Sequence, residues 1–175
     1  MRRLVCLAVV AGVGCASAPR RSLEVFPLAG ATCSRGFDPG ERHFALDVAA
    51  AEGTPVVASG AGLVLRASVH PTYGLTVILE HPRLVYTLYA HLASASVVPG
   101  DRVDAGDRIG AVGSSGNARG AHLHFEVLAA GAPLPIRATG PIGLRGEEHR
   151  LDPAALLDAP PGCGPPIPRA AASLR

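Results

Sequence analysis

The chain of 175 residues has no lysine and no tryptophan, and aromatic residues make up only 4% of it. All 16 basic residues are arginines. The absence of lysine excludes any chemistry that needs a lysine amine. The scarcity of aromatic residues means that a core must be built mainly from Val, Leu, Ala and Ile, which is feasible for one domain of this length.

Glycine and proline keep the apolar stretches short. The chain holds 21 glycines and 16 prolines, a pattern that favours a turn-rich β fold over a helix bundle. Β-branched and aromatic residues predict strands within residues 54–60, 62–69, 75–81 and 83–92. The repeat GDRV (100–103) and GDRI (106–109) is typical of successive tight β turns. LDPAALL (151–157) predicts a short helix with Asp152 as its N-cap.

Residues 1–15 are typical of an export signal, with Arg2 and Arg3 before a short apolar stretch. Cys15 lies where a lipoprotein signal is cleaved, although Gly12 stands where Leu is usual. Cleavage near Ala16 or Ala18, or no cleavage, are the alternatives. We therefore expect an exported protein of the cell envelope, either secreted or tethered to a membrane through lipidated Cys15.

Removal of this signal leaves arginines and acidic residues in equal number. No basic run and no basic patch interleaved with aromatic residues remains in the sequence. Because nucleic-acid binding depends on such positive charge, we expect no nucleic-acid partner.

Four cysteines are present, at positions 6, 15, 33 and 163. The first two fall in the export signal, which leaves Cys33 and Cys163 as a pair in an oxidising compartment. We expect an intrachain disulfide between them. Two zinc thiolates are the alternative, which the absence of any CxxC spacing disfavours.

The segment GAHLHFEV (120–127) raises the question of a metal site. In a strand, His122, His124 and Glu126 would share one face, and Leu123 and Phe125 would lie on the opposite, core-facing side. An isolated HxH is more often a solvated polar face, so this motif alone is a weak signal. Glu126 is expected to be a surface residue, with the orientation of a ligand imidazole as its alternative role.

Two further segments carry histidine. ERHFALD contains His43 and Asp47, which lie too far apart in an extended strand to share one ion but can meet on a helix or across a bend. The alanine-rich HFALDVAAAEG would allow a helix by propensity alone. YAHL places His91 at the end of a predicted strand. The other histidines are expected to lie on the surface, at positions 70, 81 and 149.

In this order, HxxxD, YAHL and HLHF resemble the lysostaphin-like zinc peptidases of the M23 family, also called LytM domains. The resemblance runs from about Gly36 to Val127 and includes the segments GTPV, YGLTVILEH, TLYAHL, GDRVDAGDRIGAVG and SSGNARGAHLHFEV. By this resemblance, His43, Asp47 and His124 are the ligands of one Zn²⁺ ion, and His91 and His122 are catalytic. It also implies an antiparallel β fold with little helix, an open substrate groove, and a bend rather than a helix in the HxxxD segment.

We therefore expect an export signal (1–15), a linker (16–34), a peptidase domain (35–158) that the resemblance defines, with an insertion near 137–150, and a C-terminal tail (159–175) rich in Pro and Ala. The resemblance implies a zinc metalloendopeptidase that cleaves the peptide stems of peptidoglycan. Two departures are visible: Ala45 replaces a usual glycine, and Phe37 stands nearest to where many members carry a tyrosine before the first histidine.

Two alternatives belong to other functional classes. One is a catalytically inert LytM domain that binds or activates another cell wall hydrolase. Such relatives typically lose metal ligands, whereas this sequence retains all five site residues. The other is a biotinyl or lipoyl carrier domain, which the GDRVDAGDRIG turns resemble. A carrier needs an acceptor lysine, and this chain has none.

Overall fold

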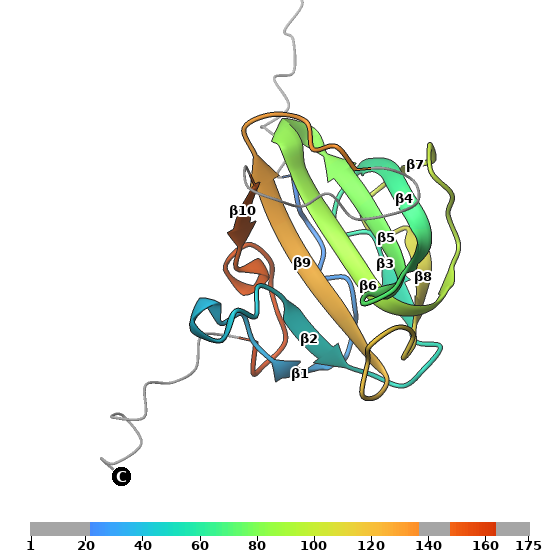
Figure 1. Ribbon diagram of the computed structural model, residues 1–175, viewed down its shortest axis with the longest axis vertical. Coiled ribbons are helices and arrows are strands. Elements are labelled where there is room, and N and C mark those ends of the chain that lie inside the picture. Colours follow the sequence, from blue (N-terminus) through green and yellow to red (C-terminus); the bar gives the residue numbers. More distant parts are fainter. Residues whose placement is uncertain (1–21, 137–147, 164–175) are drawn as a thin grey trace, which may run out of the picture.

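The computed structural model describes residues 22–136 and 148–163 (Figure 1). Within them the chain forms ten strands and three single-turn 3₁₀ helices. The strands are β1 (Thr32–Arg35), β2 (Leu46–Ala49), β3 (Pro55–Val57), β4 (Gly62–His70), β5 (Gly74–His81), β6 (Val85–Ala95), β7 (Arg102–Val103), β8 (Arg108–Val112), β9 (His122–Ala130) and β10 (Glu148–Leu151). The 3₁₀ helices are η1 (Pro39–Glu41), η2 (Pro82–Leu84) and η3 (Pro153–Ala155).

All of these strands belong to one antiparallel sheet. Its main path runs β1-β2-β9-β6-β5-β4-β7, with β10 beside β9, and β8 between β3 and β6. Strand β9 lies near the middle: β6 pairs along one edge, and β2 and β10 pair with successive parts of the other. The expectation of a mainly antiparallel β fold with little helix is confirmed.

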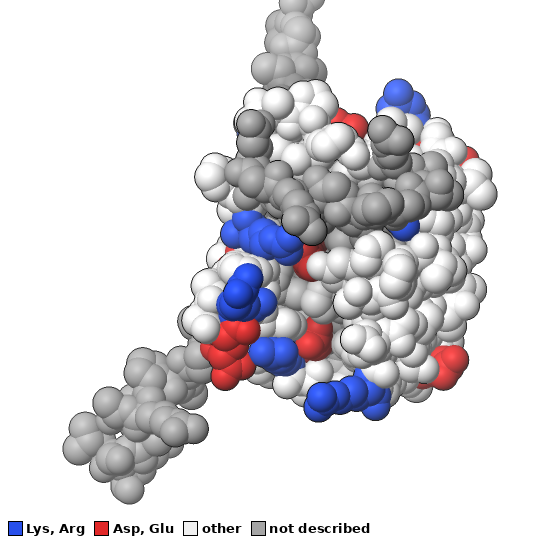
Figure 2. Space-filling model, in the orientation of Figure 1, with Lys and Arg blue, Asp and Glu red and all other residues white. Residues whose placement is uncertain are grey.

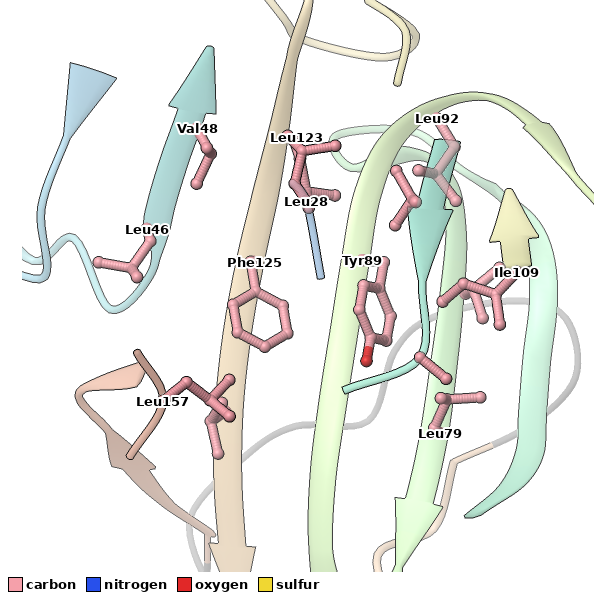
Figure 3. Close-up of a cluster of buried hydrophobic side chains, with 14 of the residues drawn as sticks. Leu28, Leu46, Val48, Leu79, Tyr89, Leu92, Ile109, Leu123, Phe125 and Leu157 are labelled. Atoms are coloured by element: carbon pink, nitrogen blue, oxygen red, sulfur yellow. The ribbon is translucent and has the colours of Figure 1, made fainter. Parts of the chain in front are cut away.

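The main core lies against one face of β9. Leu123, Phe125 and Val127 are fully buried there, as the alternation in HLHFEV predicts (Figure 3). The ring of Phe125 lies 5.3 Å from that of Tyr89 on β6, measured between centroids. The hydroxyl of Tyr89 accepts a hydrogen bond from the backbone N–H of Ser59, so its polar atom is satisfied inside the core. The opposite face of β9 is therefore free to carry polar side chains.

The GDRV and GDRI repeat forms two equivalent turns. In each, the aspartate accepts a hydrogen bond from the backbone N–H three residues earlier, at 2.8 Å for both Asp101 and Asp107. The glycine before each aspartate has a positive φ, 101° at Gly100 and 90° at Gly106. A side chain would strain this backbone, which explains why glycine precedes the aspartate twice. The tight turns expected from the repeat are confirmed.

The segment LDPAALL forms only one turn of 3₁₀ helix, η3. Asp152 caps it by accepting a hydrogen bond from the backbone N–H of Ala154 at 2.9 Å. The predicted cap is correct, but the helix is a single 3₁₀ turn, shorter than the helix expected over residues 151–157.

Cys33 and Cys163 form a disulfide, as expected, with their Cα atoms 5.1 Å apart. The bond joins β1 to the segment after η3, across a sequence separation of 130 residues. It thus closes almost the whole described chain into one covalent loop.

Several expectations differ from the structure or fall outside it. The linker expected over residues 16–34 is structured from residue 22, because Leu23 and Leu28 pack into the core and β1 begins at Thr32. His81 was wrongly expected on the surface. It is buried, with Nδ1 donating to the carbonyl of Ala61 and Nε2 paired with the hydroxyl of Thr87.

The export signal and the lipidation of Cys15 concern residues outside the described ranges, as do most of the insertion near 137–150 and the tail beyond residue 163. In the described part of the chain, no helix has the length and apolar character required to cross a membrane.

Replacing both Cys33 and Cys163 by serine is expected to lower the free energy of unfolding by about 2–5 kcal/mol, because the disulfide restricts the unfolded chain over a very long loop. Denaturant unfolding followed by circular dichroism measures this. The wild-type protein in reductant is the control and should unfold like the double variant. Equal stability of oxidised and reduced wild type would contradict the prediction.

Candidate metal centre

The site is organised by pairing across three strands on the polar face of β9. Asp47 of β2 lies opposite His124 of β9, and Ala49 lies opposite His122. On the other edge of β9, Ala90 of β6 lies opposite His124. Residues facing one another in an antiparallel pair have side chains on the same side of the sheet. The pairing therefore brings Asp47, His122 and His124 together.

His43 reaches the same place through a bend in the chain. Asp38 caps η1 with its carboxylate, Arg42 ends η1 with a left-handed backbone (φ 57°), and His43 bridges back to Asp38. The chain then turns into β2, so His43 Nε2 lies 3.1 Å from Asp47 Oδ2. The helix that propensity would allow over HFALD does not form, and the bend implied by the family resemblance is present.

His43, Asp47 and His124 offer donor atoms that all lie within 4.8 Å of one another. The other nitrogen of His43, Nδ1, donates to the carbonyl of Gly36 at 2.7 Å, which leaves Nε2 as the unprotonated nitrogen. That Nε2 is buried and makes no hydrogen bond. It lies close to the carboxylate of Asp47, but the contact does not have the geometry of a hydrogen bond. A buried polar atom without a partner is costly. Two imidazoles and one carboxylate fit a divalent metal and would leave a tetrahedral position open.

His124 lies between two carboxylates. Its Nδ1 is 2.8 Å from Asp47 Oδ1, and its Nε2 is 3.1 Å from Glu126 Oε1. Burial lowers the pKa of His124, but the hydrogen bonds and charges of Asp47 and Glu126 outweigh burial and raise this pKa to about 9. Burial likewise raises the pKa of Asp47, but the neighbouring histidines, His124 above all, hold it below its usual value. The metal-free site therefore carries a proton that a metal would displace.

His91 is aimed at the site by a bulge in β6. Strand β6 pairs with β9 as far as Ala90 and with β8 from Leu92 on, and its register against β5 shifts over the same stretch. His91, between the two, has a left-handed backbone with φ 60°. Such bulges redirect a side chain next to functional sites. The ring of His91 lies 4.8 Å from that of His122 and 5.7 Å from that of His124.

Backbone carbonyls determine the tautomers of His91 and His122. The Nδ1 of His91 donates to the carbonyl of Ser115 at 2.8 Å, and the Nδ1 of His122 donates to the carbonyl of Gly120 at 2.9 Å. In both rings Nε2 is then the basic nitrogen, and that of His122 is 3.9 Å from Asp47 Oδ1. Burial lowers the pKa of His91, and the two neighbouring histidines lower it further, so this ring is neutral at pH 7. Both rings can accept a proton at Nε2.

Ser115 ties the loop before β9 to the rest of the site. Its hydroxyl donates to the carbonyl of Leu92 at 2.7 Å and accepts from the backbone N–H of Leu75 at 2.9 Å. Gly74 allows this approach, because a Cβ there would overlap the backbone of Ser115. The contact explains how a loop residue can hold the ring of His91 in a constant position.

The five residues predicted for the site thus lie together, while their roles stay predictions. Glu126 was expected to be a surface residue, and this was wrong: its side chain is only 3% exposed. Leu88 of β6 lies opposite it and belongs, with Ile78 and Ala90, to a small apolar cluster on this face of the sheet. The alternation in HLHFE placed Glu126 beside His124, but burial could not be deduced without this cluster.

Tyr73 and Arg150 were not anticipated. Tyr73 precedes β5, and its ring lies 5.5 Å from that of His124. Burial and the charge of Glu126 raise the pKa of its hydroxyl, so it stays protonated. Phe37, the residue nearest to where many members of the family that the sequence resembles carry a tyrosine, packs edge-on against Phe44, at 6.1 Å between centroids. Tyr73 begins the segment YGLTVILEH that carries part of the family resemblance, but only long-range contacts bring its hydroxyl to Glu126.

Charged side chains are unevenly distributed on the face shown in Figure 2. Arginine and acidic residues gather over β1, β2 and β10, whereas the visible surface over the lower parts of β5 and β6 carries few charges. The metal centre lies between β2 and β6, close to the boundary between these two regions.

Comparison with known proteins matches residues 41–135 to the model of peptidase family M23. The peptidoglycan DD-endopeptidase ShyA of Vibrio cholerae is 39% identical over 92 residues, which cover 53% of this chain and 21% of that protein. A zinc-containing peptidase from Vibrio cholerae is 31% identical, with a TM-score of 0.57, and the match covers 61% of this chain and 36% of that one.

The antimicrobial peptidase lysostaphin from Staphylococcus simulans has the same fold, with a TM-score of 0.62 and 23% identity over 86% of this chain and 60% of that chain. This chain spans about a fifth of the length of ShyA.

The left-handed backbone of His91 leads to a prediction about stability. We expect His91→Gly to be more stable than His91→Ala by about 1 kcal/mol, because only glycine adopts this conformation without strain. Denaturant unfolding of both variants measures the difference. Ala93→Gly, two residues along β6, is the control and should lose stability, as glycine in a strand normally does. A more stable His91→Ala would contradict the prediction.

The pKa of His124 predicts how metal binding depends on pH. Below pH 9 the metal-free His124 holds a proton on the nitrogen facing Asp47, and a metal must displace that proton. The apparent affinity for a divalent metal should therefore rise about tenfold per pH unit from pH 7 to pH 9 and then level off. Competition with a chelator of known pH dependence measures this. A constant affinity over this range is the opposing result.

Proposed function

This chain belongs to peptidase family M23, and from that membership we propose that it is a zinc-dependent endopeptidase that cleaves peptide cross-links of bacterial peptidoglycan. The observation that carries the proposal is the convergence of His43, Asp47 and His124 within 4.8 Å, with the rings of His91 and His122 beside them. A structural cluster would not need a buried, unpaired imidazole nitrogen next to a carboxylate.

We assign the metal to His43 Nε2, Asp47 and His124 Nδ1. A zinc ion held there would supply a nucleophile from water near neutral pH and would polarise the carbonyl of the bond to be cut. Because the Nδ1 atoms of His91 and His122 donate to backbone carbonyls, each ring presents Nε2 to the substrate. One ring accepts a proton during attack, and a protonated ring donates to the developing oxyanion or to the leaving amine.

The substrate we propose is a cross-linked peptide stem lying along the sheet in extended form. An extended peptide suits contacts between its main chain and strand edges. The similarity to a peptidoglycan DD-endopeptidase supports a bond between D-alanine and a diamino acid rather than a glycine bridge. The predicted export signal would deliver the protein to the envelope, where this polymer lies, with a tether through lipidated Cys15 as one form of that delivery.

The test is digestion of purified sacculi of the diaminopimelate type by zinc-loaded protein, with the products identified by mass. We expect uncross-linked muropeptides from wild type, and a loss of about 10³-fold or more in rate for His124→Ala, because the metal centre supplies most of the rate enhancement. His149→Ala removes an exposed histidine of β10 and is the matched control, expected to retain full activity. Removal of zinc by a chelator should abolish cleavage, and zinc should restore it.

Other outcomes would select another function. Cleavage of a glycyl substrate while the diaminopimelate sacculi stay cross-linked would overturn the proposed bond. Bound zinc without release of any peptide, or no bound zinc at all, would favour the alternative of a catalytically inert domain that activates another cell wall hydrolase. The metal content of the purified protein therefore has to be measured together with the digest.

A further inference from the structure

The carboxylate of Glu126 is buried directly behind the metal centre and has three partners. Its Oε1 accepts hydrogen bonds from the hydroxyl of Tyr73 at 2.8 Å and from Nε2 of His124 at 3.1 Å. Its Oε2 lies 2.7 Å from Nη1 of Arg150. The side chain is 3% exposed, so both oxygens depend on these partners.

This contact determines which nitrogen of His124 faces the proposed metal. A carboxylate only accepts hydrogen bonds, so Nε2 must carry its proton toward Glu126. The other nitrogen, Nδ1, then points at Asp47, 2.8 Å away, among the donor atoms of the candidate site. Rotation of the ring would break the bond to Glu126 and bury an unpaired N–H.

Arg150 comes from β10, which pairs with β9 beyond the site. Its guanidinium makes the ion pair with Glu126 and also lies 5.4 Å above the ring of Phe44, the neighbour of His43. Arg150 thus contacts Glu126, the partner of His124, and Phe44, the residue that follows His43 in the chain. Its side chain is 24% exposed, so the pair is largely shielded from water.

From this geometry we propose that Glu126 is a positioning residue that holds His124 with Nδ1 toward the metal, and that Arg150 of β10 holds Glu126 in place. The inference rests on the proposed metal site. It assigns β10 a part in metal binding, although β10 lies outside the segment that matches the family model. The competing interpretation is a structural ion pair with no effect on the metal.

The experiment compares wild type with Glu126→Gln, Arg150→Gln and the double variant of the full chain. Zinc affinity is measured by competition with a chromophoric chelator. The protonated nitrogen of His124 in the zinc-loaded protein is identified by ¹⁵N NMR, and folding is followed by thermal unfolding. The double variant removes both charges together, so it avoids the unpaired buried charge that can prevent either single variant from folding.

We expect zinc affinity to fall about 10- to 100-fold in Glu126→Gln and to stay low in the folded double variant, as is usual when the partner of a ligand imidazole is lost. Arg150→Gln should lose less zinc affinity, because Glu126 can still accept the hydrogen bond from Nε2 of His124. In zinc-loaded wild type, the proton on Nε2 of His124 should be protected from exchange with solvent. In Glu126→Gln this proton should exchange faster. A folded double variant with wild-type zinc affinity and an unchanged Nε2 signal would falsify the proposal.

Arg102→Gln is the control. It removes an exposed arginine from β7, which lies at the opposite end of the sheet path from β1 and β2. Its zinc affinity should equal that of wild type. Zinc affinity and the NMR signal are measured without substrate, so they test the role of Glu126 independently of cleavage. Wild type that binds zinc but leaves sacculi intact would overturn the proposed function, and the two measurements would still test the role of Glu126.

Discussion

The pairing of β9 with β2 on one edge and β6 on the other is the constraint on which the site depends. In this register Asp47, His124 and Ala90 lie in one row across three strands. A slip by one residue would turn Asp47 or His124 toward the core, because side chains alternate with a period of two. The register is strongly specified, since the same slip would expose Leu123 and Phe125, both fully buried.

Two irregular segments bring the remaining two histidines, His43 and His91, to the site that the regular strands form. The bend around η1 brings His43 to Asp47, and the bulge at His91 turns that ring to the same face. Both include residues with left-handed backbones, Arg42 and His91, which are unfavourable unless surrounding contacts hold them. The imidazoles of His43 and His91 donate to the carbonyls of Gly36 and Ser115, which orients both rings. The site is therefore regular where it lies on the sheet and strained where it departs from it.

Much of the site could be predicted from local sequence, but its environment could not. The spacing in HLHF predicts two imidazoles on one strand face, and the ordered motifs identify the family. The alanine-rich HFALDVAAAEG favours a helix by propensity, and the bend there results from the bridge between Asp38 and His43 and the pairing of β2. The burial of Glu126 and His81 depends on neighbouring strands, so a histidine or glutamate in isolation gives no indication of it.

The sequence by itself determined the strand alternation, the paired turns at Asp101 and Asp107, the cysteine pair and the identity of the five candidate site residues. The first three depend on residue types at short spacing or on simple counting, and the five site residues depend on the resemblance of the ordered motifs to the M23 family. Only the tertiary structure decided that Tyr73 and Arg150, far from Glu126 along the chain, would share its carboxylate. It also decided which nitrogen of His91 is basic, because the carbonyl that accepts from its ring belongs to Ser115, in a loop that the fold places beside β6.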